Sequence, residues 1–304
     1  MDIILKISQE LMCRQEQVAA AVKLIDEGCT IPFIARYRKE ATGSLNDEQL
    51  RTLDERLTYL RGLEDRKEKV IASIEEQGML TDELKKSILA AETLVAVEDL
   101  YRPYKPKRKT RATIAQSKGL TGLANIISLQ MTNKPILEEA LAYVSEEKEV
   151  HSAEEAIAGA MDIIAESISD NAEYRTEIRS LTMDKGILMT TAKDPEAESV
   201  YEMYYDFSTP VRKMTGYRTL AINRGEKEKF LSVKIEAPVD EITGYLIRQV
   251  IVRDNPNTND ILRNTITDSY ERLIAPSIER DIRSSLTEAA EDGASKVFGS
   301  NLKQ

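Results

Sequence analysis

The chain has 304 residues, which is long enough for about two domains and for a substantial core without disulfides or metals. Its 42 basic and 52 acidic side chains leave a formal net charge of −10, which excludes a general attraction to nucleic acid or anionic membranes, so such binding needs a local cationic patch. The sequence holds neither a signal-peptide core nor a run of about eighteen apolar residues, and we therefore expect a cytoplasmic protein with no membrane partner.

Most of the chain predicts helix, and we expect a mainly α fold. Apolar residues recur at spacings of three and four, with Asp, Asn, Thr or Ser at the helix starts and glycine after several ends. Pro276 is expected to break the last helix. The expected helices are 2–12, 15–27, 47–77, 82–91, 153–169, 172–184, 242–252 and 260–298.

The longest of these helices is expected from Asp47 to Gln77, where Gly78 stops it. Asn46 and Gln49 have the spacing of a capping box, and leucines and isoleucines form one stripe after it. A rod of this length usually serves as a spine for shorter helices. A second capping box is expected from Ser152 and Glu155.

One segment, KFLSVKIEAP, alternates apolar and polar residues and predicts a short strand near 230–237. An isolated strand is not stable, so this segment needs a partner that the sequence does not identify, or it is an extended connector. The proline-bearing turn at 132–135 marks a candidate boundary between a first region, 1–131, and a second region, 132–304.

Signals for catalysis are sparse. The single histidine, His151, is expected on the surface beside a helix cap, and no glycine-rich phosphate loop is present. Cys13 and Cys29 are expected to be buried or incidental thiols in a reducing compartment. The sequence therefore favours a non-enzyme that needs no cofactor and no metal.

The segment YRPYKPKRKTR carries six cations and no acid. Pro103 and Pro106 oppose helix and favour an extended path. Its cations suit phosphate oxygens, and its two tyrosines could stack on unpaired bases. A solvated loop, or a loop docked on this protein's own acidic surface, is equally compatible with the sequence. The six cations are Arg102, Lys105, Lys107, Arg108, Lys109 and Arg111.

Two further clusters are basic. In IPFIARYRKEATG we expect the apolar positions Phe33, Ile34 and Tyr37 to face inward, while the cations Arg36, Arg38 and Lys39 fan outward. A structural role for these arginines, in which they clamp neighbouring carbonyls or carboxylates, is favoured on the bare sequence. The third cluster, GYRTLAINRGEKEKF, mixes both signs and is typical of a packed corner.

These clusters also carry a resemblance to a known family. The motifs IPFIARYRKEATGSL and LEDRKEKVIASIEEQGMLTDELKKSILAAETLVAVEDLYRPYKPKRKTRATIAQSKGL resemble the N-terminal region of Tex-type transcription accessory proteins. AIAGAMDIIAESIS and YRTLAINRGEKE fit the same order, so the resemblance covers essentially the whole chain. The family consists of bacterial relatives of a large eukaryotic transcription elongation factor.

The resemblance implies an elongated multi-helix array with a long central helix and a helix-turn-helix-like bundle. In the family a resolvase-like domain, helix-hairpin-helix motifs and an OB-fold RNA-binding domain follow, and this chain ends about where the resolvase-like domain would begin. The family is taken to bind nucleic acid and to act in transcription, without an established catalytic activity.

Two hypotheses for function follow. The leading one is a non-enzymatic transcription accessory factor that binds RNA or DNA through phosphates. The alternative is a scaffold that contacts RNA polymerase or other domains without binding nucleic acid. A nuclease is a third, less favoured hypothesis, because the sequence shows no arrangement of carboxylates that supports it. The candidate binding residues are Arg102, Lys105, Lys107, Arg108, Lys109 and Arg111, with Arg36, Arg38 and Lys39 second.

Overall fold

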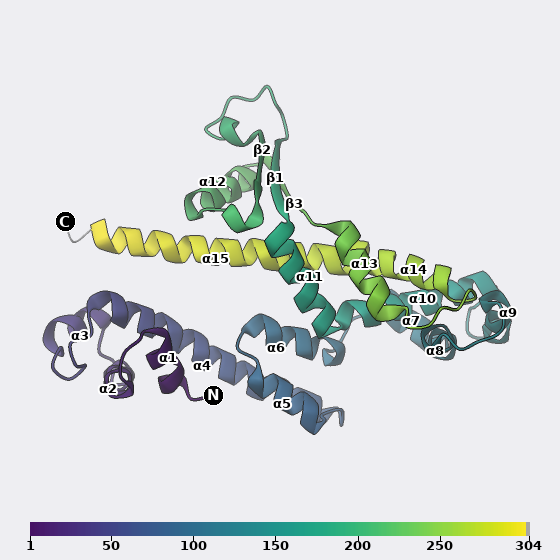
Figure 1. Ribbon diagram of the computed structural model, residues 1–304, viewed down its shortest axis with the longest axis horizontal. Helices are drawn as coiled ribbons and strands as arrows, with labels where there is room; N and C mark the ends of the chain where they lie inside the picture. The colour runs from purple at the N-terminus through teal and green to yellow at the C-terminus, as the bar shows by residue number, and fades with distance from the viewer. Residues whose placement is uncertain (302–304) are drawn as a thin grey trace. The chain divides into compact units, whose positions relative to one another are not determined.

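The computed structural model describes residues 1–301, with side chains described through residue 293. It divides into two compact units, unit 1 from Met1 to Lys105 and unit 2 from Pro106 onward, and each is described by itself (Figure 1). Helices make up most of both units, which confirms the mainly α fold. Within residues 1–301, no helix combines the length and the apolar character that crossing a bilayer needs.

Unit 1 is a set of short helices packed on one long helix, α4. Each of the other α-helices of the unit contacts α4 or a neighbour that does, so the expected spine is confirmed. The elements are α1 (Ile3–Glu10), α2 (Gln15–Asp26), α3 (Ile31–Tyr37), α4 (Asp47–Glu76), α5 (Asp82–Ala90), α6 (Leu94–Tyr101) and the 3-10 turn η1 (Arg102–Tyr104).

The helix α4 forms as its sequence predicts. The Asn46 side chain accepts a hydrogen bond from the Gln49 amide at 2.8 Å, and the Gln49 side chain accepts one from the Asn46 amide at 3.0 Å. Gly78 adopts φ +67° just after the helix, a left-handed conformation that glycine reaches without strain. The buried stripe consists of Leu50, Leu53, Leu57, Leu60, Leu63, Lys67, Val70 and Ile74.

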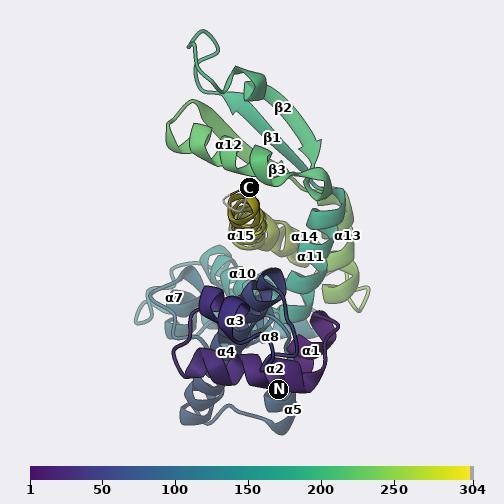
Figure 2. The ribbon, with the colours of Figure 1, turned by 90° about the vertical axis from the view of Figure 1, so that its left-hand side faces the viewer.

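Unit 2 combines a helical body with a small sheet, and α12 lies between the sheet and α15 (Figure 2). The first elements are α7 (Arg111–Ser117), α8 (Thr121–Leu129), α9 (Ile136–Ala140), η2 (Leu141–Tyr143), α10 (Ala153–Asp170), α11 (Ala172–Lys185), β1 (Ile187–Ala192), η3 (Glu202–Tyr204) and β2 (Asp206–Pro210). They are followed by η4 (Val211–Lys213), α12 (Gly216–Lys227), β3 (Leu231–Glu236), α13 (Val239–Val250), α14 (Asn259–Asp268), the π-helical turn η5 (Ser269–Ile274) and α15 (Ala275–Asn301).

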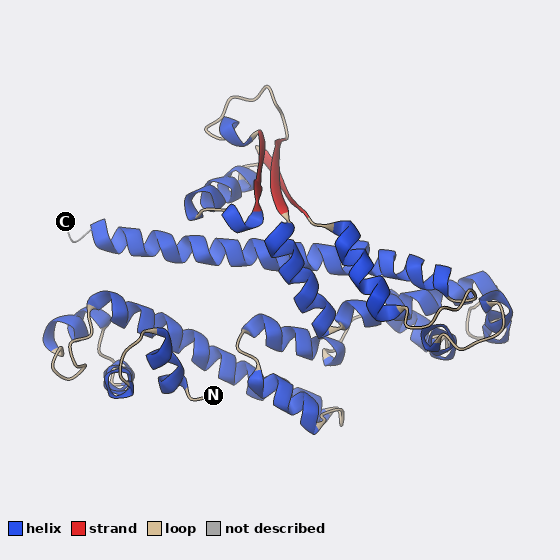
Figure 3. Cartoon of the chain, viewed as in Figure 1, coloured by secondary structure: helices blue, strands red, loops and turns tan. Residues whose placement is uncertain are grey.

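The expected strand is β3, and its partner is β1 (Figure 3). The central strand β1 pairs antiparallel with β3 on one side and β2 on the other, so Thr190 lies opposite Val233 and Phe207. The sequence did not predict β1 or β2. Gly186 allows the chain to leave α11 and enter β1, because a side chain there would collide with the carbonyl of Thr182.

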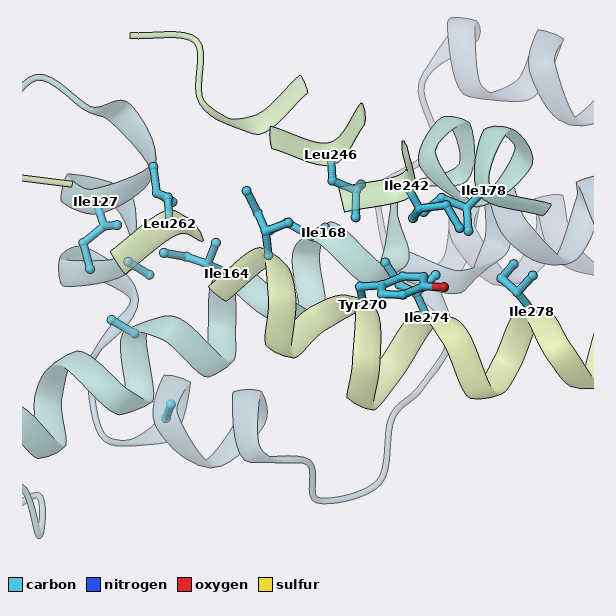
Figure 4. Close-up of a cluster of buried hydrophobic side chains, with 14 of the residues drawn as sticks. Ile127, Ile164, Ile168, Ile178, Ile242, Leu246, Leu262, Tyr270, Ile274 and Ile278 are labelled. Carbon is cyan, nitrogen blue, oxygen red and sulfur yellow. The ribbon is translucent and has the colours of Figure 1, made fainter. Parts of the chain in front are cut away.

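The core of unit 2 is built from isoleucines and leucines of several helices (Figure 4). Helix α10 contributes Ile164 and Ile168, which lie near Leu262 of α14. Further along, Tyr270 of η5 lies near Ile274. The shared apolar face explains why α7, α8, α9 and α14 all pack on α10.

Pro276 does not break the last helix, so that expectation is wrong. The chain stays helical from Asn259 to Asn301, with the π-helical turn η5 immediately before the proline. A proline removes one backbone donor, and its ring clashes with the carbonyl four residues earlier. That residue, Arg272, lies in η5, where the wider turn accommodates the ring.

One other expectation, the capping box at Ser152, differs from the structure in part. The Ser152 hydroxyl caps α10 by accepting from the Glu155 amide at 3.1 Å, but the Glu155 carboxylate accepts from the His151 amide at 2.9 Å, so the second half of the box is displaced by one residue. Residues 111–129 pack on α10 and therefore belong to unit 2 by contact. The regional boundary expected at 131/132 stays a prediction.

Candidate nucleic-acid interface

The basic segment from Arg102 to Arg111 follows the path expected from its prolines. Pro103 lies in the short turn η1, where the Lys105 amide donates to the Tyr101 carbonyl at 3.0 Å, and the chain from Pro106 to Lys109 lies outside any helix. Helix α7 starts only after Thr110, whose hydroxyl accepts from the Thr113 amide at 3.1 Å. The cations between these two elements are carried by non-helical backbone.

Lys107 is already neutralised by carboxylates of the same unit. Its ammonium forms a salt bridge with Asp170 and a second one with Glu166 at 3.4 Å, both on α10. The side chain is only 24% exposed. Of the alternatives that the sequence left open for this segment, docking on the protein's own acidic surface is therefore the one that Lys107 follows.

Two more cations of the segment are constrained by the fold, Arg102 by partial burial and Arg111 by nearby carboxylates. Arg102 is half-buried, and its Nε has no hydrogen-bond partner among the described residues. Arg111 acts electrostatically on Asp268 and Asp162. The pKa of Asp268 is lowered, first by its hydrogen bonds from Arg272 and also by Arg111, whereas burial raises the pKa of Asp162 against the pull of both arginines.

The remaining cations of the segment are exposed and unpaired. Among the described residues, no carboxylate lies within 4.0 Å of the charged groups of Lys105, Arg108 or Lys109. Arg108 and Lys109 belong to unit 2, and we refer to these two side chains as the loop surface. Lys105 is the last residue of unit 1.

A second cationic surface lies at the end of α3. Arg36, Arg38 and Lys39 are all exposed, and we refer to them as the α3 surface. Over residues 1–293, none of their charged groups forms a salt bridge or donates a hydrogen bond to a carbonyl. The structural role that the sequence favoured, with these arginines clamping neighbouring groups, is therefore wrong.

The backbone that carries this surface is held by a short turn. The Thr42 hydroxyl is buried and lies 3.3 Å from the carbonyls of both Arg38 and Lys39, and the Ser44 amide donates to the Lys39 carbonyl at 2.7 Å. Gly43 adopts φ +58°, and its carbonyl accepts from the Gln17 side chain at 2.8 Å. These bonds hold the backbone from which the three cationic side chains project into solvent.

The aromatic residues of α3 are exposed, not buried. Ile34 faces inward as expected, but Phe33 is 38% exposed and Tyr37 is 62% exposed. The helix has seven residues and buries one side, so the pair spaced by four residues remains outside. The Phe33 and Tyr37 ring centroids lie 5.3 Å apart, and the Arg38 guanidinium lies 5.4 Å from the Phe33 centroid. The signal in the sequence was the four-residue spacing of Phe33 and Tyr37, with Arg36 and Arg38 on either side of Tyr37.

The third basic cluster is a packed corner, as expected. The Arg218 guanidinium lies 5.6 Å from the ring centroids of both Phe207 and Tyr217. Glu226 of the same cluster accepts a hydrogen bond from Arg283 at 2.6 Å, which ties α12 to α15. Arg218 and Glu226 of this cluster are therefore engaged in packing.

The described residues contain no cluster of potential metal ligands. Within residues 1–293, no three of the His, Cys, Asp and Glu side chains are placed to hold a metal ion. His151 is exposed, as expected, and its Nδ1 lies 3.3 Å from a carboxylate oxygen of Glu146. Cys13 and Cys29 are half-buried free thiols, and burial raises the pKa of the Cys13 thiol.

Comparison with known proteins places this arrangement in a family. Residues 1–75 match the model of the Tex-like protein N-terminal domain, and residues 131–298 match the model of the Tex central region-like family. A protein of Bacillus subtilis (strain 168), YdcI, is 47% identical over 302 residues, which cover 98% of this chain and 42% of that protein.

Two further relatives carry descriptive names. "Transcriptional accessory protein Tex" of Neisseria gonorrhoeae is 40% identical over 100% of this chain and 41% of its own length. The human "S1 RNA-binding domain-containing protein 1" is 30% identical over 94% of this chain and 30% of its own length. The chain spans about two fifths of the length of the curated bacterial relatives it matches. With both family models matched in order, the chain belongs to the Tex family, of which it spans the N-terminal and central regions.

Proposed function

We propose that this chain is a nucleic-acid-binding part of a transcription accessory factor and that it has no catalytic role of its own. It binds RNA or DNA through phosphates at two separate places, the α3 surface and the loop surface. One observation carries the proposal: the five cations of these two surfaces are exposed, and none of them has an intramolecular carboxylate within 4.0 Å among the described residues, although the whole chain has a net charge of −10.

The chemistry of these side chains fits phosphate. A guanidinium presents a planar fork of donors that matches phosphate oxygens, and an ammonium is a compact charge with three donors. Each contact releases condensed counterions from the nucleic acid, so binding of this kind weakens steeply with salt and does not depend on sequence. The names of the Neisseria and human relatives, which refer to transcription and to RNA binding, are consistent with this proposal.

The test is binding of fluorescent single-stranded RNA and duplex DNA across a series of salt concentrations. We expect a variant with all five cations replaced by glutamine to lose up to about 3.5 units of the log–log salt slope on a single strand, at about 0.7 per contact. The five replacements are Arg36→Gln, Arg38→Gln, Lys39→Gln, Arg108→Gln and Lys109→Gln.

A matched control removes the same charge from elsewhere. It replaces five exposed or half-exposed cations, each of which already has a carboxylate partner, and we expect it to keep the wild-type salt slope. If both variants lose the same affinity, net charge decides binding and the two surfaces do not. If neither the wild type nor the variants bind, the proposal is wrong. The control positions are Arg51, Arg61, Lys69, Lys185 and Arg212, all changed to glutamine.

A second candidate function is a scaffold that contacts RNA polymerase or another protein. It is favoured by exposed apolar side chains near α8 and α9, where Leu129, Met131, Leu137 and Leu141 all lie open to solvent. Capture of purified polymerase by the chain, together with the absence of any salt-dependent binding to RNA or DNA, would select this function over the first.

A further inference from the structure

The exposed aromatic pair of α3 has no structural explanation within unit 1. Phe33 and Tyr37 are 38% and 62% exposed, whereas the same helix buries Ile34 completely. Their ring centroids lie 5.3 Å apart with planes inclined by 45°, and Arg38 lies against the Phe33 ring. Exposing two large rings to water is unfavourable, so their arrangement points to a partner that covers them.

The chemistry around the rings identifies the class of partner. Three cations surround the pair, and none of them forms an ion pair with a carboxylate of the described residues. An aromatic face stacks on a nucleobase, while the neighbouring guanidinium and ammonium groups reach the adjacent phosphates. Aromatic and arginine side chains also anchor protein partners, and a surface built only for a protein would leave the unmodified chain without affinity for an oligonucleotide.

We propose that Phe33 and Tyr37, with Arg38 beside them, form a stacking platform for unpaired bases of single-stranded nucleic acid. This inference rests on the proposed function and deepens it at the α3 surface. A base pair in a duplex already stacks on both of its neighbours, so the platform selects single strands over duplexes. Because every base has a π face, the platform is tolerant of sequence.

The chain contains no tryptophan, which allows a direct test. The variant Tyr37→Trp places one indole at the platform, and a base stacked on that indole quenches its fluorescence. We expect single-stranded oligouridine to quench the emission, and a backbone of the same length without bases to bind through its phosphates without quenching. A second variant, Tyr37→Leu, is expected to weaken binding to the single strand by at least about fivefold, with little change for a duplex.

The matched control is Tyr217→Trp in unit 2. Tyr217 is 65% exposed and also lies beside an arginine, Arg218, but outside the α3 surface. We expect no quenching there. Equal quenching at both positions, or none at position 37 while the oligonucleotide is bound, would overturn the platform and leave phosphate binding intact. Absence of binding by the unmodified chain would overturn both the platform and the proposed function.

Discussion

The salt bridge of Lys107 leads to the sharpest prediction, because it separates two kinds of cation within one short segment. Lys107 is paired with Glu166 and Asp170, whereas Arg108 and Lys109 have no such partner among the described residues. We predict that Lys107→Gln leaves the salt dependence of nucleic-acid binding unchanged. The double variant Arg108→Gln/Lys109→Gln is predicted to make it shallower.

The magnitude follows from counterion release. Each phosphate contact to a single strand contributes about 0.7 to the slope of log affinity against log salt, so the loss of two contacts removes about 1.4. When the salt concentration rises from 50 to 200 mM, both proteins lose affinity. The fold loss should be about seven times smaller for the double variant than for the wild type. Fluorescence anisotropy with a labelled single-stranded RNA at five or six salt concentrations measures this difference.

A third variant tests the same reasoning in the opposite direction. Replacing Glu166 and Asp170 with glutamine and asparagine frees Lys107, and the slope is expected to steepen by up to about 0.7. If Lys107→Gln lowers the slope as much as the loss of Arg108 or Lys109 does, then pairing within the chain does not decide which cations reach phosphate. The reasoning from the structure would then be refuted.

Three further predictions concern stability, measured as the free energy of unfolding in urea. Gly159→Ala should cost about 1–3 kcal/mol, because the added carbon would overlap a buried leucine side chain, whereas Gly62→Ala in the open middle of α4 should add about 0.5–1 kcal/mol. Lys67→Met should cost about 1–3 kcal/mol, because it removes the 2.8 Å bond from the buried ammonium to a backbone carbonyl in α5. Hydrogen bonds from Arg56 lower the pKa of Glu10 below its ordinary 4.5. This pair therefore stabilises the fold above about pH 4.5, and the stabilisation is lost as the pH falls through the folded pKa. Glu10→Gln should remove that part of the acid dependence.

Local signals in the sequence predicted α1, α2, α4 and α5 of unit 1, whereas α6 was not predicted. The structure uses the Asn46 cap, the following leucine stripe and Gly78 as predicted, and each of these signals is local, since it depends on residues a few positions apart. The strand β3 was predicted by alternation, because Leu231 and Ile235 lie on one buried face. These signals depend on neighbours in the chain and need no knowledge of the tertiary fold.

Features set by distant contacts could not be predicted in this way. The partners of Lys107 lie about sixty residues along the chain, and no spacing rule connects them. Strand β1 lacks a clear alternation and is defined by its two neighbours. Phe33 and Tyr37 were expected inside because large rings usually are, but α3 buries only one side. The free state of Arg108 follows from the absence of a nearby carboxylate among the described residues, which the sequence does not reveal.

The π-helical turn η5 also keeps the core-facing residues of the last helix in register. Leu262, Ile266, Tyr270, Ile274, Ile278 and Ile282 are all buried, at intervals of four residues. In a plain α-helix each such interval overshoots a full turn by about 40°, and five intervals would carry the row about 200° around the axis. The extra residue in the π turn takes back about 100° of that rotation, and the rest fits within one broad apolar face. Deleting a single residue from 269–274 would therefore let the turn become plain α-helix with Ile278 and Ile282 still facing the core, whereas converting the turn to α-helix at its present length would rotate both by about 100° away from the core.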